Sequence, residues 1–385
     1  MEITREAIEQ AVESYRQEML DYWKELVNFQ AGSKEGERMF ALLSQVNAKL
    51  NREGFASELL PTGSPIPLLR AYLGKERPGK PILLSGHLDT VFPNGSYPEN
   101  PFTIRDGKAY GPGVNDMKGG IVMAIYLAKV LDKLGYAKHP FKLVFVGDEE
   151  TTHIGSQADV LLAQEAEGCL AAFNFETGRM DNGLIVGRKG CMDVWITVTG
   201  KAGHVGNAYA SSSNAIEEMA YKIVELRKLT NLDLGLIVST DIISGGTVSN
   251  AVADHCRIEV DCRYDFNADK PMLEEKIKEI CARTYVPGTT TEVQFVSSMP
   301  VFEKTAGNEH LLDLVNQAAQ EFGQPAFGPA HPGGCSDASF MAKAGIPILC
   351  SCGVQGDGAH TKHEFANVET MFTRTKLLAA AICKL

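Results

Sequence analysis

Acidic and histidine side chains collect at the ends of apolar segments in the first half of the sequence. His87 and Asp89 close the segment PILLSGHLD, and the run Asp148, Glu149 and Glu150 follows FKLVFVG. Carboxylates that end an apolar strand repel one another and lose solvation, so some other group should compensate them. Neighbouring side chains at a strand end point in opposite directions, so the two glutamates can serve different purposes.

The same residue types recur later in the chain. Asp116 lies in the turn YGPGVNDMKGG, Glu176 ends LAAFNFE, and His360 and His363 follow the apolar segment IPILCSC in GAHTKHEF. Two or more histidines with three or four carboxylates form a ligand set for a divalent transition metal, with zinc as the leading candidate. Alone, an HxD pair, an acidic turn or a histidine near a C-terminus is more often a capping or surface feature. Their conjunction favours a metal site.

The elements that would position these residues alternate between strands and helices. PILLSGHLD, FKLVFVG and LAAFNF predict buried strands. One long amphipathic helix is predicted at residues 8–26. Further helices are predicted at 35–53, 117–135, 153–166 and 310–322 and at the C-terminus. Short apolar strands separated by helices indicate an α/β fold with a mostly parallel sheet covered by helices on both faces. Ligands bind such sheets at the carboxyl ends of the strands.

A different pattern occupies residues 188–299. The elements there follow the order β-α-β-β-α-β, which is typical of a ferredoxin-like α+β unit. The strand HCRIEVDCRY alternates apolar and charged residues, so one face of its sheet should be wet. We therefore expect a larger domain made of residues 1–187 and 300–385, with a smaller domain inserted at 188–299.

Composition excludes several classes of protein. The chain has 385 residues, is 44% hydrophobic and carries a net charge of −11, which disfavours a nucleic-acid surface. No apolar run is long enough to cross a bilayer, and MEITREAIEQ does not resemble a secretory signal. The nine cysteines are scattered rather than paired, which is typical of reduced thiols in the cytoplasm.

Five segments together carry a resemblance to a known family. They are SGHLDTVFP, PFTIRDGKAYGPGVNDMKGG, GDEE, NFETG and GAHTKHEF. They resemble the dizinc metallopeptidase family of glutamate carboxypeptidase (carboxypeptidase G), acetylornithine deacetylase, succinyl-diaminopimelate desuccinylase, aminoacylase and peptidase T. The resemblance covers almost the whole chain, including the inserted domain, and the glutamate carboxypeptidase type looks most similar. It implies a zinc-exopeptidase-like catalytic domain and an inserted domain that serves as a lid and dimerisation domain.

The resemblance also implies roles for the metal-site residues. His87 and Glu176 would bind one zinc, Glu150 and His360 the other, and Asp116 would bridge both; cobalt or manganese could substitute. His360 fits better than His363 because the family pattern places a glutamate, here Glu364, four residues after the histidine.

Two catalytic roles and one backbone feature follow from the same resemblance. Asp89 would orient His87, and Glu149 would be the general base on a metal-bridging water. A cis peptide bond is expected after Asp116.

The resemblance extends to residues that would hold the substrate. His204, in GKAGHVG of the inserted domain, would donate to the oxyanion in the active site of a partner subunit, which implies a homodimer. The residues implied in binding the substrate carboxylate are Asn250, Arg263, Gly333, Gly334 and Ser336.

The predicted function is a metal-dependent hydrolase that cleaves an amide bond next to a free carboxylate. The substrate would be a small peptide or an N-acyl amino acid, and the enzyme a carboxypeptidase, dipeptidase or deacylase. Three segments depart from the glutamate carboxypeptidase pattern near the expected position of the substrate side chain, namely Thr151–His153, Cys335 and Ser297–Met299. Glutamate specificity therefore does not follow.

A catalytically silent, metal-dependent protein that binds amino acids or peptides is the alternative. Retention of Glu149 argues against it, since a binding protein needs no base. An oxidoreductase is disfavoured because GPGVND does not form GxGxxG.

Overall fold

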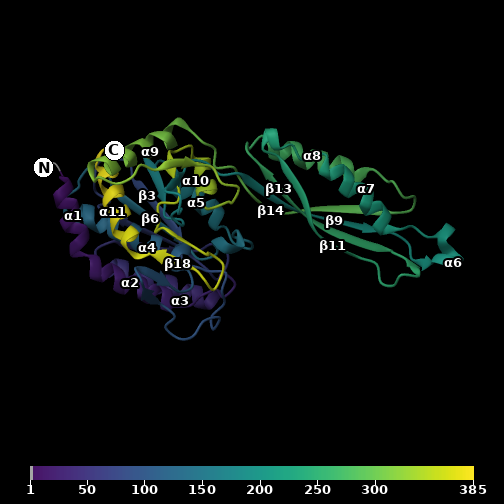
Figure 1. The fold of residues 1–385 in the computed structure, drawn as a ribbon, viewed down its shortest axis with the longest axis horizontal. Helices are drawn as coiled ribbons and strands as arrows, with labels where there is room; N and C mark the ends of the chain where they lie inside the picture. The colour runs from purple at the N-terminus through teal and green to yellow at the C-terminus, as the bar shows by residue number, and fades with distance from the viewer. Residues whose placement is uncertain (1–2) are drawn as a thin grey trace. The chain divides into compact units, whose positions relative to one another are not determined.

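Two sheets organise the chain, each within its own unit of the computed structural model, which describes residues 3–385 (Figure 1). Unit 1 comprises the chain up to Gly187 together with Lys304–Pro332 and Ser336–Leu385; unit 2 comprises Arg188–Glu303 and Gly333–Cys335. No helix within the described residues combines the length and apolar composition needed to cross a lipid bilayer.

The larger sheet belongs to unit 1 and has six strands. Their order is β1 (Ala56–Leu60), β2 (Leu68–Leu73), β6 (Phe141–Val146), β3 (Ile82–His87), β7 (Ala171–Asn174) and β16 (Ile348–Leu349). The last four strands run parallel to one another, whereas β2 is antiparallel to both of its neighbours, β1 and β6. This confirms the expected α/β fold with a mostly parallel sheet. Sequence patterns alone did not assign the antiparallel edge.

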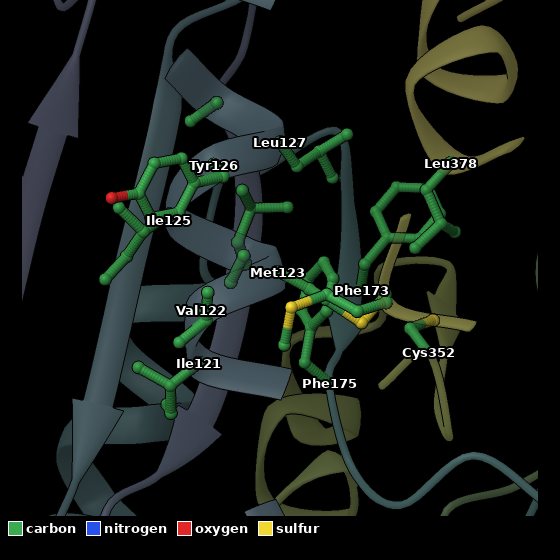
Figure 2. Close-up of a cluster of buried hydrophobic side chains, with 14 of the residues drawn as sticks. Ile121, Val122, Met123, Ile125, Tyr126, Leu127, Phe173, Phe175, Cys352 and Leu378 are labelled. Atoms are coloured by element: carbon green, nitrogen blue, oxygen red, sulfur yellow. The ribbon is translucent and has the colours of Figure 1, made fainter. Parts of the chain in front are cut away.

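Helices pack around this sheet. They are α1 (Arg5–Ser14), α2 (Arg16–Asn28), α3 (Gly36–Arg52), α4 (Gly119–Lys133), α5 (Ala158–Ala166), α9 (Ala306–Glu321), α10 (Ala338–Met341) and α11 (Val368–Cys383). Helix α4 is apolar and buried on nearly all sides, because it contacts strand β3 and helices α2 and α11. Figure 2 shows its side chains with Phe173, Phe175, Cys352 and Leu378 of the surrounding elements.

Two helix predictions are wrong in detail. The expected single helix at 8–26 is interrupted at Tyr15, which has φ −100° and ψ −1°. The Ser14 hydroxyl donates to the carbonyl of Ala11 at 2.7 Å, a local bond that competes with helical pairing. The helix expected at 153–166 begins only at Ala158, because residues 149–151 form a short 3-10 helix and turns and bends follow it up to residue 157.

Unit 2 contains a four-stranded antiparallel sheet with the order β11 (Ile237–Gly245), β13 (His255–Tyr264), β9 (Gly190–Thr199) and β14 (Thr290–Met299). Helices α7 (Ala215–Arg227) and α8 (Asp269–Ala282) lie on one face of it (Figure 1). The β-α-β-β-α-β order and the alternating burial along β13 are as predicted. Unit 2 runs to Glu303 and includes Gly333–Cys335, whereas the inserted domain was expected to end at residue 299. A lid function for unit 2 stays a prediction.

Short strands complete the fold. A small sheet contains β17 (Gly356–Asp357), β18 (Phe365–Asn367), β5 (Lys108–Tyr110) and β4 (Thr103–Arg105), and β15 (Gly328–Ala330) pairs with β8 (Gly183–Ile185). In unit 2, β10 (Gly203–His204) pairs with β12 (Ala251–Val252), next to the short helix α6 (Val205–Ala208). Because β5 pairs with β18, the small sheet brings the turn after β5 beside the loop between β17 and β18.

Helix α4 begins unusually close to the strand segment that leads to Glu176. A Cβ atom on Gly120 would lie 1.9 Å from the backbone oxygen of Phe175, which is closer than real Cβ contacts allow. Only glycine therefore permits this approach of helix and strand.

We predict that Gly120→Ala lowers the free energy of unfolding by about 1–3 kcal/mol, as other overpacking substitutions do. Alanine favours a helix over glycine by only about 1 kcal/mol, which the clash with a backbone atom should outweigh. Urea unfolding would measure the change. Gly328→Ala is the control, because nothing lies within 4 Å of its Cβ, and its effect should stay within about 0.5 kcal/mol. Equal stability of both variants would contradict the prediction.

Candidate active site

The register of the large sheet brings the predicted site residues to one edge. His87 ends β3 and is paired with Val146, the last residue of β6, so the turn with Glu149 and Glu150 starts beside it. On the other side of β3, Ser85 is paired with Asn174, two residues before Glu176. Three neighbouring parallel strands thus deliver a histidine and three carboxylates to the same edge, as parallel pairing requires.

Asp116 lies between two histidines that come from distant parts of the chain. Its Oδ1 is 3.1 Å from Nε2 of His87, and its Oδ2 is 3.2 Å from Nε2 of His360. Glu150 Oε2 is 3.0 Å from Nε2 of His360, and Glu176 Oε1 is 3.7 Å from Nε2 of His87. Each oxygen of one carboxylate therefore faces a different histidine, and each histidine has a second carboxylate at hand.

These residues have the chemistry of a metal centre. Ligand atoms of His87, Asp116 and Glu150 lie within 4.8 Å of one another, as do those of His87, Glu149 and Glu176. Imidazole nitrogens and carboxylate oxygens are the donors that zinc accepts, and several of them converge on each histidine. The residues present therefore fit divalent ions.

The electrostatics of the cluster follow from its crowding. Hydrogen bonds that the His360 imidazole donates to Asp116 and Glu150 raise its pKa to about 10. Burial lowers the pKa of His87, but bonds to Asp116 and Asp89 outweigh burial and raise it well above its usual range. Burial raises the pKa of Asp116, yet the two histidines hold it well below its usual range. The carboxylates therefore favour the protonated, positively charged form of both imidazoles.

Asp89 supports His87 from behind. It is 0% exposed, and its Oδ1 lies 3.3 Å from Nδ1 of His87. The hydroxyl of Ser33 donates to Asp89 Oδ2 at 2.6 Å, and the backbone N–H of Glu150 donates to the same oxygen at 3.1 Å. Burial raises the pKa of Asp89, but His87, followed by Ser33 and the Glu150 N–H, lowers it below its usual value, so the residue stays ionised. Asp89 can therefore fix the ring orientation of His87.

Glu149 occupies the same turn as Glu150. Among the described residues, no ion pair joins its carboxylate to His87 or to His360. Desolvation raises the pKa of its carboxyl well above the usual range; His87 opposes this, while Glu176 and Asp337 add to it. A carboxyl with a raised pKa takes up a proton more readily, as a general base requires.

The turn that carries Asp116 is held by Glu364. The carboxylate accepts the backbone N–H groups of Gly113, Asn115 and Asp116 at 2.9, 2.7 and 2.9 Å. Burial raises the pKa of Glu364 to about 7, although these N–H donors oppose the shift. The Asp116–Met117 peptide bond is cis, as expected. Glu364 thus holds the turn of Asp116 in place, while the exposed His363 lies outside the cluster of ion pairs.

Two groups of the predicted substrate-binding residues lie in unit 2. His204 pairs with Ala251 in the β10–β12 ladder, and the N–H of Val205 donates to the carbonyl of Asn250 at 3.1 Å. His204 and Asn250 are therefore neighbours, and both are exposed.

Arg263 lies near the far end of β13 from this pair. Its guanidinium binds both oxygens of Asp261 at 2.7 and 2.6 Å, a partner that the sequence did not suggest. Its Nη1 also donates to the carbonyl of Gly333 at 3.4 Å and contacts Cys335 Sγ at 3.4 Å.

Gly334 and Ser336 complete the predicted loop. The carbonyl of Gly334 accepts from Arg188 Nη1 at 2.9 Å. Ser336, in unit 1, is 1% exposed and its hydroxyl lies 3.6 Å from Cys350 Sγ. Its side chain is thus directed at a buried cysteine.

Sequence reasoning missed a buried network beside Glu149. It joins Asp148, expected only to form part of a turn, to His153 and through His153 to Asp337. His153 was expected near the substrate side chain, but it is 3% exposed and both ring nitrogens have protein partners. Its position after the two glutamates is the only sequence signal that could have pointed to it.

We compared the chain with known protein families, sequences and structures, and the results agree with one another. Residues 83–384 match peptidase family M20/M25/M40. Over 372 residues the chain is 29% identical to Carboxypeptidase G2 of Pseudomonas sp. (strain RS-16), covering 94% of this chain and 88% of that protein. Over 358 residues it is 27% identical to succinyl-diaminopimelate desuccinylase of Bradyrhizobium sp. (strain ORS 278), covering 88% and 90%. The fold resembles that of the aminopeptidase PepT from Bacillus cereus ATCC 10987, with a TM-score of 0.78, 22% identity and coverage of 96% and 98%.

We predict that zinc binding near neutral pH releases protons. The raised pKa of His360, about 10, means that its ring carries a proton that must leave before the nitrogen can bind an ion. Roughly one to two protons per chain should appear, and zinc affinity should fall as the pH falls. Calorimetric titrations in buffers of different protonation enthalpy measure this number. His363→Gln should leave the release unchanged, and zinc binding without any release would contradict the prediction.

Proposed function

The chain belongs to peptidase family M20/M25/M40 and is a metal-dependent hydrolase of amide bonds; we propose that it cleaves the amide bond next to a free carboxylate with a dizinc centre. The observation that carries this proposal is the position of Asp116, whose two oxygens face His87 and His360 separately. A carboxylate placed in this way can bridge two ions.

The proposed assignment of ligands is supported by the distances. His87 and Glu176 would hold one ion and Glu150 and His360 the other, with Asp116 shared between them. Asp89 would keep the other ring nitrogen of His87 occupied, and so direct Nε2 at the ion. Zinc is the proposed metal, with cobalt or manganese as substitutes.

Glu149 is the proposed base. When bound, the pair of divalent ions polarises the scissile carbonyl and acidifies the attacking water. Glu149 takes the proton of that water and later returns it to the nitrogen of the leaving amine. Its raised pKa supports this role, because the carboxyl can hold the proton between the two transfers. A silent binding protein would have no use for such a group, and no observation favours that alternative.

The substrate carboxylate is proposed to bind at Arg263 with the loop that contains Gly333, Gly334 and Ser336. A guanidinium offers several donors in a planar fork, and Asp261 occupies two of them and holds the group in a fixed orientation. The remaining Nη1 faces Gly333, so it can turn to an incoming carboxylate.

His204 and Asn250 are proposed to act in the site of a second subunit. The part of β13 from His255 to Arg263 spans roughly 26 Å at ~3.3 Å per residue. His204 pairs with Ala251, which precedes His255, so it lies still farther from Arg263. An amide beside a carboxylate is much shorter than this span. His204 and Arg263 of one chain therefore cannot touch the same substrate, whereas His204 of a partner can.

A homodimer through unit 2 is consistent with its surface. Strand β11 is an edge strand of the sheet, and its Ile242 and Ile243 are 56% and 58% exposed. Exposed apolar side chains continue along α6 and α7 and nearby turns: Val205, Tyr209, Ile216, Tyr221 and Val224. Open edges and apolar surface of this kind are features that a second copy can cover.

The substrate class is best found by a screen of zinc-loaded protein against dipeptides and N-acyl amino acids. The two sequence relatives are named a carboxypeptidase and a desuccinylase, so both classes belong in the screen. Hydrolysis only of substrates with a free carboxylate next to the amide supports the proposal. Equal hydrolysis of the corresponding carboxamides would contradict it.

We predict that Glu149→Gln lowers kcat by about 10²–10⁴-fold while the protein keeps its metals, because only the base is removed. Glu150→Gln should instead lose metal, because Glu150 faces His360. Metal analysis and kinetics of the two variants measure the difference, and exposed Glu167→Gln is the control. Identical metal contents in the Glu149 and Glu150 variants would show that their roles are not divided in this way.

We further predict that mixing His204→Ala with Glu149→Gln restores activity when subunits exchange. Each variant alone should be nearly inactive. In a heterodimer, one site has both defects and the other has neither, so up to half of the wild-type activity per heterodimer should return.

A control mixture with a variant of Arg263 in place of the His204 variant should give the opposite result. Arg263→Ala with Glu149→Gln should restore nothing, because Arg263 binds the Gly333–Cys335 loop of its own chain and each heterodimer site keeps one defect. Heterodimers that form without any activity in the His204 mixture would exclude action across the dimer.

A further inference from the structure

The turn that carries the proposed base has a backbone that needs support. Thr152 and His153, which follow Glu149 and Glu150, have φ values of 51° and 58°. Two consecutive residues with a Cβ rarely adopt this left-handed conformation, and a β-branched threonine does so least readily. Such a turn persists only where surrounding interactions impose it.

His153 supplies those interactions. Its Nδ1 lies 2.7 Å from Oδ1 of Asp148, and its Nε2 lies 2.8 Å from Oδ1 of Asp337. The three side chains are buried, with exposures of 3%, 4% and 2%. Because both carboxylates accept, both ring nitrogens must donate, so the ring is an imidazolium. Burial lowers the pKa of His153, but the charges and hydrogen bonds of the two aspartates raise it to about 11.

The two aspartates belong to different parts of unit 1. Asp148 directly precedes Glu149, whereas Asp337 stands at the start of α10, and 184 residues separate His153 from it. The ring of Phe340 in α10 packs edge-on against the imidazole of His153, with 5.5 Å between the two ring centres. The imidazolium therefore fastens the turn after β6 to α10.

The opposite side of the same turn is held by Asp89. Its carboxylate accepts the backbone N–H groups of Glu149 and Glu150 at 3.4 and 3.1 Å. Within the turn, the N–H of His153 and the hydroxyl of Thr151 each donate a hydrogen bond to the carbonyl of Asp148 at 3.1 Å. The two glutamates thus sit between two independent anchors, Asp89 on one side and His153 on the other.

We propose that His153 is a positioning residue that holds Glu149 in place for proton transfer through its bridge between Asp148 and Asp337. The proposal rests on the proposed function of Glu149. A buried ion pair is a weak source of stability compared with apolar packing, so the gain from this bridge is orientation. Small displacements of a reacting group cost much rate, which makes such an anchor useful.

The first arm of the test does not depend on activity. In protein labelled with ¹⁵N-histidine, His153 should show protons on both ring nitrogens, shifted downfield and in slow exchange, across the neutral pH range. His153→Gln should remove both signals and Asp337→Asn should shift or lose the Nε2–H signal. A ring that carries only one proton near neutral pH would overturn the proposal, whatever substrate the enzyme takes.

The second arm is kinetic, on zinc-loaded protein with the best substrate of the screen. His153→Gln should lower kcat by about 10- to 100-fold, with KM changed less than about twofold and the metal content unchanged. Asp337→Asn should lower kcat by about tenfold, and the double variant should lose no more than His153→Gln alone, because the bridge is already broken. His139→Gln is the control, since its ring binds the carbonyl of Lys80 at 2.9 Å outside the site.

The outcomes separate positioning from a purely structural role. A structural role predicts a lower Tm but an unchanged kcat per folded, metal-loaded chain, and that result would overturn the proposal. A loss of metal that parallels the loss of activity would overturn it as well. If His153→Gln does not fold, Asp337→Asn decides, because it keeps the histidine. A wild-type enzyme that hydrolyses no amide would instead refute the proposed function, and the spectroscopic arm would still test the bridge.

Discussion

Mutual repulsion of carboxylates at the strand ends is the constraint on which the rest of the site depends. Asp116, Glu149, Glu150 and Glu176 converge at one edge of the sheet, and Asp89 lies behind them. In the absence of metals, the two histidines that face them retain protons, as their raised pKa values indicate. In our account, divalent ions replace those protons when the site is loaded, so binding of metal and loss of protons are one event.

Much of unit 1 serves to keep these groups at fixed positions. Glu364 binds the turn of Asp116 through three backbone N–H groups, and Asp89 binds the turn of Glu149 through two. Gly120 lets α4 begin against the strand segment before Glu176. A metal-binding residue is useful only when its orientation is fixed by the groups behind it. The same reasoning gives His153 a purpose, because it anchors the side of the turn that Asp89 does not reach.

The sequence was most informative where a pattern repeats locally. Apolar strands ending in His87 and in Glu149-Glu150 predicted both the parallel sheet and the edge at which the site lies, because side-chain periodicity encodes burial. The resemblance added the pairing of His360 with Asp116, which no local pattern could supply. The interruption at Tyr15 went unpredicted because apolar periodicity continues through it, and only the local bond of Ser14 marks the break.

Contacts between distant segments account for the rest. The bond between His153 and Asp337 joins segments 184 residues apart, and neither residue follows an apolar period that would reveal it. The pairing of Arg263 with Asp261 was also missed, although the two share one face of a strand. Such polar pairs depend on rotamers that tertiary packing selects, so they become visible only in the folded chain.

Anomalous diffraction at the zinc edge from crystals of the zinc-loaded protein tests the central claim most directly. Our account predicts two peaks in each active site, one contacted by His87 and the other by His360, with one oxygen of Asp116 toward each. A single peak, or two peaks that share no contact with Asp116, would contradict it.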